Sequence, residues 1–195
     1  MSSPMARIAA FLLVAAAGLA WQGSSLAAQR WDIDPRRTRI AFGIDSIGWP
    51  RTEGEFRTFS GRITIDFDRP QRSKAEFSVD AGSVQVGSDP LAALIRSTAF
   101  LNVDRHPRMT FVSTSVEKLD SRTARVEGTL TLLGVSKPVQ LEVKVEGDPG
   151  RGKRLGFKAA WSIMRSEFGM SAGTPIVADK VDLVVTTEAV EKEGQ

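Results

Sequence analysis

The stretch RVEGTLTLLGVSKPVQLEVKV, residues 125–145, decides the fold, because it contains two alternating arms joined by a short turn. In its second arm, VQLEVKV at residues 139–145, every other side chain is apolar and those between are polar or charged. The first arm, residues 125–132, alternates in the same way. A period of two is typical of a β-strand with one buried and one solvated face. Gly134 allows the chain to turn between the arms, and Pro138 belongs at the start or the edge of a strand.

A hairpin of this length cannot bury its own apolar face, so further strands must cover it. The same alternation recurs along the chain and is separated by turn-forming residues, with Gly48-Trp49-Pro50 as one break in the pattern. Evenly spaced strands of this kind indicate an all-β barrel or sandwich, and a closed barrel leaves no strand edge exposed. The predicted strands are Trp31–Pro35, Arg39–Ile47, Gly54–Ser60, Arg62–Phe67, Lys74–Asp80, Met109–Val116, Leu155–Ile163 and Lys180–Val190.

One segment, between Ser88 and Ala99, has helical spacing instead. Asp89 is a good helix cap, and Pro90 suits the first helical position. The apolar residues that follow recur every three to four positions. We expect one short helix of about two turns, placed over an open end of the sheet.

The first 28 residues have the three-part layout of a secretory signal peptide. Arg7 precedes an apolar run from Ile8 to Ala20, and small residues follow at Ser25-Leu26-Ala27-Ala28. The run is shorter than the roughly 20 residues that a membrane-spanning helix needs. We expect cleavage after Ala27 or Ala28, one mature domain over residues 29–195, and no stable membrane insertion. With no cysteine in the chain, an exported protein must rely on an ordinary core, and a bacterial periplasm is the expected compartment.

Charge excludes one class of partner. The formal net charge of the whole chain is +3, and basic and acidic residues are interspersed. The densest basic cluster, Arg151–Arg154, lies in a Gly-rich turn. A nucleic-acid surface needs a basic stripe with aromatic residues beside it, and the sequence has none.

Several short motifs, in this order, are shared with a known family. The two strongest are GTLTLLGVSKPV at residues 128–139 and RSEFG at residues 165–169. On these motifs the sequence resembles the YceI-like family of periplasmic polyisoprenoid-binding proteins, over the whole predicted mature chain. The weaker motifs are WDIDP at 31–35, FSG at 59–61, SV at 83–84, RS at 96–97, FLNV at 100–103 and HP at 106–107 with Phe111.

The resemblance implies an extended eight-stranded, lipocalin-like antiparallel barrel. It also implies that a long isoprenoid chain, such as a quinone or prenyl pyrophosphate tail, is held inside the barrel for carriage or storage, without a reaction or a cofactor. The sequence departs from the family pattern at Leu91–Ile95, where the family has an Arg-Asp-x-His-Leu run. Aliphatic groups therefore replace polar ones near the expected pocket. The oligomeric state stays open, a homodimer included.

Large apolar side chains on the predicted inner faces are the candidates for ligand contact. From the residues alone, packing in an ordinary core is the simpler interpretation of these side chains. With the resemblance, roughly half of them are expected to line a cavity, because an eight-stranded barrel has room for one small ligand. The candidates are Phe42, Phe56, Phe77, Leu94, Phe100, Phe111, Leu132, Trp161, Ile163, Phe168 and Met170.

Polar candidates are few. His106 is the only histidine, and one histidine makes neither a metal site nor a catalytic triad, so we expect no catalytic residue and no metal. Arg165 and Glu167 are either a polar clamp for a ligand head group or, as we prefer, a structural ion pair. Two alternatives remain: a lipid hydrolase that uses Ser166 or His106, and an interaction module whose barrel is filled by its own side chains.

Overall fold

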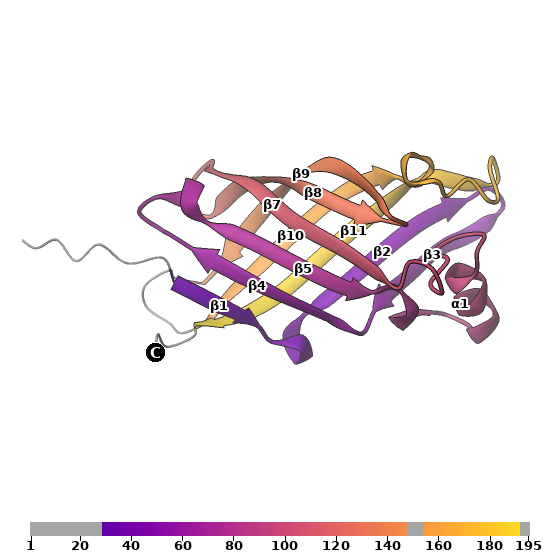
Figure 1. Cartoon of the computed structure of the whole chain (residues 1–195), viewed down its shortest axis with the longest axis horizontal. Coiled ribbons are helices and arrows are strands. Elements are labelled where there is room, and N and C mark those ends of the chain that lie inside the picture. Colours follow the sequence, from indigo (N-terminus) through magenta and orange to yellow (C-terminus); the bar gives the residue numbers. More distant parts are fainter. Residues whose placement is uncertain (1–28, 148–153, 192–195) are drawn as a thin grey trace, which may run out of the picture.

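A computed structural model describes residues 29–147 and 154–191. These residues form one antiparallel sheet of eleven strand segments and one α-helix (Figure 1). The helix is α1 (Asp89–Arg96), and short 3₁₀ helices lie at Pro35–Arg37, Pro70–Arg72, Ala81–Ser83 and Arg165–Phe168. The strands are β1 (Gln29–Ile33), β2 (Arg39–Ser46), β3 (Trp49–Phe56), β4 (Phe59–Ile65), β5 (Lys74–Asp80), β6 (Val84–Val86), β7 (Arg108–Lys118), β8 (Thr123–Leu132), β9 (Val135–Glu146), β10 (Arg154–Met164) and β11 (Val177–Glu191).

Eight of these segments close into a barrel. Neighbouring strands pair in the order β1-β4-β5-β7-β8-β9-β10-β11, and β11 pairs back to β1. Trp31 shows the closure, since it lies opposite Ile63 of β4 on one side and Glu191 of β11 on the other. The expected eight-stranded antiparallel barrel is therefore confirmed.

The remaining three segments, β2, β3 and β6, extend the barrel at one end. The long strand β11 pairs with β2 along residues 177–186 and with β1 along residues 189–191. Strands β1 and β2 therefore follow each other along one edge of β11, interrupted at residues 34–38. Similarly, β3 precedes β4 across residues 57–58, and β5 precedes β6 across residues 81–83. Eleven segments thus supply eight positions in the barrel wall.

The helix lies where the extended wall ends. β6 pairs with β3, and among the described residues it has no ladder to β7. α1 follows β6 directly and lies at that end of the molecule, at the right in Figure 1. The helical prediction is confirmed, but its cap is Ser88, whose side chain makes no capping bond, and Asp89 is already in the first turn. A carboxylate there still faces the positive end of the helix dipole.

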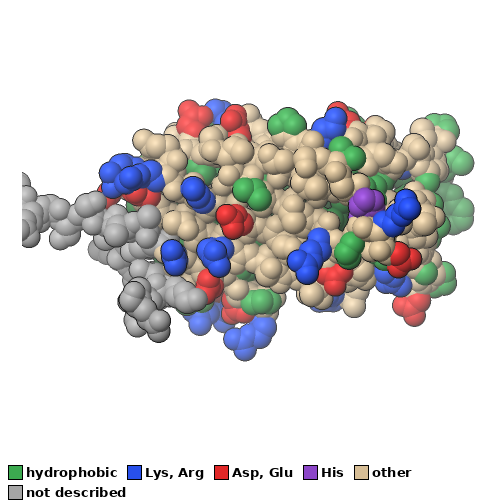
Figure 2. All heavy atoms as spheres, viewed as in Figure 1, with side chains coloured by type: hydrophobic (Ala, Val, Ile, Leu, Met, Phe, Trp, Pro, Cys, Tyr) green, Lys and Arg blue, Asp and Glu red, His purple; other side chains and the backbone are tan. Residues whose placement is uncertain are grey.

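Alternation along the strands separates the interior from the surface. In β10, Leu155, Phe157 and Ile163 are buried, whereas Lys158 and Ser162, between them, are exposed. The outer surface that faces the reader in Figure 2 carries dispersed charges of both signs over the barrel wall. The buried residues form three apolar clusters around the inside of this wall.

Three details of the strand prediction were wrong. Gly54–Ser60, predicted as one strand, is divided between β3 and β4 at residues 57–58. Trp49 and Pro50 do not break the pattern but begin β3, where a proline is tolerated because β6 pairs only with residues 54–56. The hairpin turn is Leu133-Gly134 rather than Gly134–Pro138, with φ of 53° and 76°. Positive φ at both turn residues matches the twist of the flanking strands.

Pro138 lies inside β9, opposite Thr129 of β8. β10 pairs with β9 only from Glu142 onward, so Pro138 occupies an unpaired edge, as a residue without an amide hydrogen requires. The predicted signal peptide and most of the basic cluster at 151–154 lie outside the described residues. None of the described helices is long and apolar enough to cross a membrane.

Candidate ligand-binding cavity

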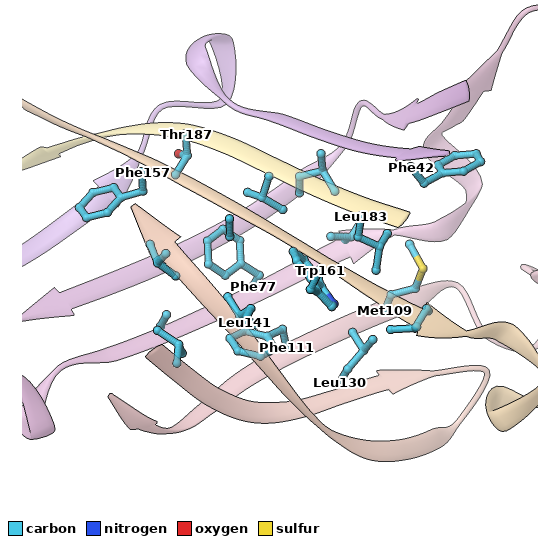
Figure 3. A pocket seen from close by; sticks show the side chains of 18 of the residues that line it. Phe42, Phe77, Met109, Phe111, Leu130, Leu141, Phe157, Trp161, Leu183 and Thr187 are labelled. Atoms are coloured by element: carbon cyan, nitrogen blue, oxygen red, sulfur yellow. The ribbon is translucent and has the colours of Figure 1, made fainter. Parts of the chain in front are cut away.

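The barrel encloses an apolar cavity of about 610 Å³. Its lining on β11 extends from Val177 to Thr187, about 30 Å along the strand at the usual rise per residue. Figure 3 shows side chains from β2, β5, β7, β8, β9, β10 and β11 that point into the same space. A volume of this size lies within the range of about 300–1,000 Å³ that is typical of small-molecule sites. The barrel is therefore hollow, and the alternative of a filled barrel is wrong.

The middle of the cavity is lined almost entirely by hydrocarbon. Thr187 is an exception, but its hydroxyl lies 2.6 Å from the Thr38 hydroxyl, and the residue is buried. The hydrogen-bonding capacity of Thr187 is therefore already used within the protein. A molecule in the middle of this cavity meets mainly dispersion contacts and the hydrophobic effect. The labelled apolar lining residues in Figure 3 are Phe42, Phe77, Met109, Phe111, Leu130, Leu141, Phe157, Trp161 and Leu183.

Ten of the eleven candidate residues line this cavity, so the expectation of roughly half was too low. The exception is Phe168, which is 1% exposed and packs in the apolar cluster at the α1 end. It borders a separate hollow of about 260 Å³ where β9 and β10 part. Those that line the cavity are Phe42, Phe56, Phe77, Leu94, Phe100, Phe111, Leu132, Trp161, Ile163 and Met170.

Sequence reasoning missed several lining residues that the same pattern could have found. Phe157 precedes Trp161 by four positions on β10 and therefore shares its face, as Figure 3 confirms. Leu141 on β9 and Leu183 on β11 lie on predicted apolar faces in the same way. Every residue on the inner face of a strand should have been counted as a candidate lining residue, whatever its size.

Trp161 lines the cavity with its indole ring. The ring lines the space near Met109 and Leu130 (Figure 3). Its Nε1 atom is buried and has no hydrogen-bond partner in the described structure. An unpaired buried N–H costs free energy, so the contribution of this residue is the apolar area of the indole.

The two ends of the cavity differ in chemistry. At the α1 end, the lining includes Leu91, Leu94 and Ile95 of the helix, so the aliphatic replacements noted in the sequence do face the pocket. At the other end, at the start of β5 and the β7–β8 turn, polar and charged side chains lie beside apolar ones such as Phe67 and Pro70. That polar mouth is formed by Asp66, Ser73, Lys74, Lys118, Asp120, Ser121, Arg122 and Thr123.

The carboxylates of the polar mouth are already engaged. Asp66 is buried and accepts a hydrogen bond from the Arg69 amide at 2.8 Å. Asp120 accepts one from the Arg122 amide at 2.7 Å, and this bond is the main cause of its lowered pKa. Both carboxylates therefore fix turns.

Residues 31–189 match the YceI-like domain family. The chain belongs to the YceI-like family. A UPF0312 protein of Pectobacterium carotovorum is 34% identical over 185 residues, which cover 93% of this chain and 96% of the relative. Protein YceI of Salmonella arizonae is 34% identical over 175 residues, covering 88% of this chain and 91% of its own.

Solved structures share the YceI-like barrel. BcnA of Burkholderia cenocepacia superposes with a TM-score of 0.76 at 25% identity, over 82% of this chain and all of BcnA (100%). A polyisoprenoid binding domain from Saccharophagus degradans superposes with a TM-score of 0.67 at 15% identity, over 83% and 98% of the two chains. At that identity the likeness shows the fold alone.

In this YceI-like domain, the RSEFG motif holds the loop before β11. Arg165 is 1% exposed, and its guanidinium donates to three carbonyl oxygens and one hydroxyl at 2.8–3.1 Å. No ion pair joins Arg165 to Glu167 within the described structure, and Glu167 is exposed. These bonds fit the structural role that we preferred for Arg165, which also borders the cavity, but the expected ion pair is wrong. The four acceptors are Ala178 O, Met170 O, Thr174 Oγ1 and Val177 O.

The polar residues considered for catalysis do not form a hydrolytic site. The Ser166 hydroxyl donates to Asp179 at 2.7 Å, and no hydrogen bond joins Ser166 to His106 among the described residues. His106 instead lies beside the Leu133-Gly134 turn. In the same part of the chain, no three His, Asp or Glu side chains gather as a metal site would need. A serine nucleophile needs a positioned general base, which Asp179 alone does not provide.

Proposed function

We propose that this YceI-like domain is a binding protein that holds a long-chain isoprenoid, such as a quinone or prenyl-type lipid, inside its barrel for carriage or storage. The apolar cavity along the barrel is the observation that carries the proposal. The name of the Saccharophagus degradans neighbour, a polyisoprenoid binding domain, agrees with it. The domain binds this molecule without changing it chemically.

The free energy available is sufficient without a strong head-group contact. Burial of each methylene contributes about 0.8 kcal/mol, so ten contribute roughly 8 kcal/mol before costs. Association and the ordering of a flexible chain offset part of that sum. A linear chain is favoured over a compact ligand because the lining extends along most of the barrel.

We also propose that the protein is exported to the periplasm after cleavage of residues 1–28. The layout of Arg7, the apolar run and the small residues before Gln29 supports this. Export of the full chain from a bacterial host, followed by mass measurement of the mature protein, tests it. We expect a mature terminus at Ala28 or Gln29; an uncleaved chain that stays in the cytoplasm contradicts the proposal.

The direct test of the ligand is extraction of the purified protein with organic solvent, followed by mass spectrometry. We expect a long-chain lipid in stoichiometric amount. Repeated absence of any lipid, together with no binding of added long-chain quinones, would rule out the proposed function.

A matched pair of variants on β10 tests whether the cavity is the site. Ala159 is buried and lines the cavity, whereas its neighbour Ala160 is exposed on the outside. Ala159→Phe fills the cavity and should weaken binding of a long-chain quinone at least tenfold, or about 1.4 kcal/mol. Ala160→Phe adds the same ring outside and should leave binding unchanged. Equal effects of the two substitutions would place the ligand elsewhere.

A further inference from the structure

Four exposed apolar side chains lie around the cavity mouth at the α1 end. Trp49 is 74% exposed, Ile47 71%, Ile176 56% and Leu94 49%. Figure 2 shows hydrophobic side chains gathered at the end of the barrel that carries α1 in Figure 1. We refer to these four residues as the apolar tip.

The apolar tip is continuous with the cavity lining. The Ile47 amide donates to the Ile176 carbonyl at 2.9 Å, which brings the β2–β3 turn beside the loop that precedes β11. The next residues inward, Ser46 and Val177, pair with each other and line the cavity. Leu94 belongs to both the tip and the lining. Apolar side chains therefore lie outside the opening at this end as well as along the barrel behind it.

Exposed apolar residues that cluster around an opening need an explanation. Single exposed apolar side chains are ordinary on any protein surface, but contiguous ones mark an interaction site. A second copy of the chain is a poor fit, because a standard protein interface uses roughly 20–30 residues on each side. A lipid bilayer fits better, because its apolar layer can take up a few large side chains without any matching pocket.

The residue types and the nearby charges agree with a bilayer. Tryptophan is enriched at membrane–water interfaces, because its ring is apolar and its N–H is polar. Behind the tip, Arg51 pairs with Asp45 at 2.8 Å and with Asp182 at 2.7 Å. Lys180 also pairs with Asp182, at 3.1 Å, so this set of two cations and two carboxylates has no net charge. Attachment here is thus expected to be apolar and not to depend on anionic lipid.

We propose that the apolar tip docks reversibly on a lipid bilayer and places the cavity mouth against the membrane. An apolar chain then passes between the bilayer and the barrel without crossing water. What passes depends on the proposed function, whereas docking itself is measured without any ligand.

Sedimentation with extruded vesicles tests the docking. Vesicles of phosphatidylethanolamine with phosphatidylglycerol, and of phosphatidylcholine alone, should both bind the mature protein, with little effect of added salt. Trp49→Ser and Ile176→Ser should each lower the partition coefficient about tenfold, because each removes a large apolar side chain from the contact. If one variant fails to fold, the other carries the test.

Leu119→Ser is the matched control. Leu119 is 40% exposed but lies in the β7–β8 turn at the polar mouth, so its replacement should leave vesicle binding unchanged. A loss as large as that of Trp49→Ser, or a wild-type protein that stays in the supernatant, would overturn the proposal. So would a Trp49→Ser variant that changes the oligomeric state but not vesicle binding, since the tip would then be a contact between copies.

The same variants separate docking from ligand binding. A long-chain quinone added from ethanol should bind to Trp49→Ser as it does to the wild type, because Trp49 does not line the cavity. Ala159→Phe should dock on vesicles while it no longer binds the quinone. A wild-type protein that binds the quinone but does not dock on vesicles would contradict only the docking proposal. A wild-type protein that docks but does not bind the quinone would contradict only the proposed function.

Discussion

Asp179 at the start of β11 accepts two hydrogen bonds from Ser166, one from its hydroxyl at 2.7 Å and one from its amide at 2.8 Å. Ser166 belongs to the RSEFG motif, so this pair ties the end of β10 to the last strand. Those two bonds, the hydroxyl first, are the main reason that the pKa of Asp179 lies below its usual value of 3.8.

The Ser166–Asp179 pair predicts a pH-dependent contribution to stability. A carboxyl whose pKa is lowered by folding stabilises the folded state above its unfolded pKa, and this contribution is lost as the pH falls through the folded pKa. Asp179→Asn should therefore lower the Tm at neutral pH. The difference from wild type should shrink below pH 3.8. Thermal melts by circular dichroism across the acid range measure it, and a deficit that is the same at every pH would contradict this account.

The four hydrogen bonds of Arg165 predict a large loss of stability when this residue is replaced. Arg165→Met leaves three carbonyl oxygens and a hydroxyl without their charged donor, in a buried loop. The free energy of unfolding should fall by about 3 kcal/mol, which urea denaturation measures. Arg165→Lys should recover only part of it, because an ammonium group lacks the planar fork. Arg105→Lys, at an exposed arginine, is the control and should change nothing. A value near zero for Arg165→Met would mean that the loop finds other donors.

The close packing around Gly128 on β8 predicts that a larger residue at this position lowers the stability of the fold. A Cβ atom there would lie 2.5 Å from the Phe111 ring and 2.7 Å from the Val112 carbonyl oxygen. Gly128→Ala should destabilise the fold by about 1–3 kcal/mol and shift the ring. Gly87→Ala, where an added Cβ meets nothing within 4 Å, is the matched control and should be neutral. Equal unfolding free energies for the two variants would show that Phe111 moves without cost.

The backbone conformation of the hairpin turn predicts that substitutions at Gly134 lower the free energy of unfolding. Gly134 has φ of 76°, in the left-handed region that residues with a Cβ disfavour. Gly134→Ala should lower the free energy of unfolding by about 1–2 kcal/mol, and Gly134→Asn by less, because asparagine tolerates this region. Chemical denaturation of both variants measures the difference. An alanine variant as stable as the asparagine variant would contradict the role of φ.

Much of the fold could be predicted because alternation is local. Lys74–Asp80 was predicted with the bounds that β5 has, since its apolar and polar residues alternate without exception. Trp49 and Pro50 were assigned to a break, because a Gly-Trp-Pro run suggests a turn and the missing partner on one side of β3 is a property of the whole sheet. The alternation also selected residues that line the cavity, but not how many, because the width of the barrel does not appear in any one strand.

Arg165 shows where sequence reasoning ends. An arginine two residues before a glutamate suggests an ion pair, and no local pattern reveals that carbonyl oxygens from residues 170–178 surround it instead. Phe168 is a similar case. It borders the hollow where β9 and β10 separate, and no local pattern reveals that separation. The apolar tip was also missed, since Ile47 and Ile176 are far apart in the chain and are brought together only by the fold.

Among the described residues no ladder of backbone hydrogen bonds joins β6 to β7, and α1 packs against β6 on that side of the molecule. Side-chain packing yields to a bulkier guest at lower cost than a ladder that must break bond by bond. The barrel wall at that end is thus expected to deform more readily than at the opposite end, where eight strands pair continuously. A lipid chain held as proposed would therefore meet a less constrained wall at the α1 end than at the opposite end, where all eight strands are paired.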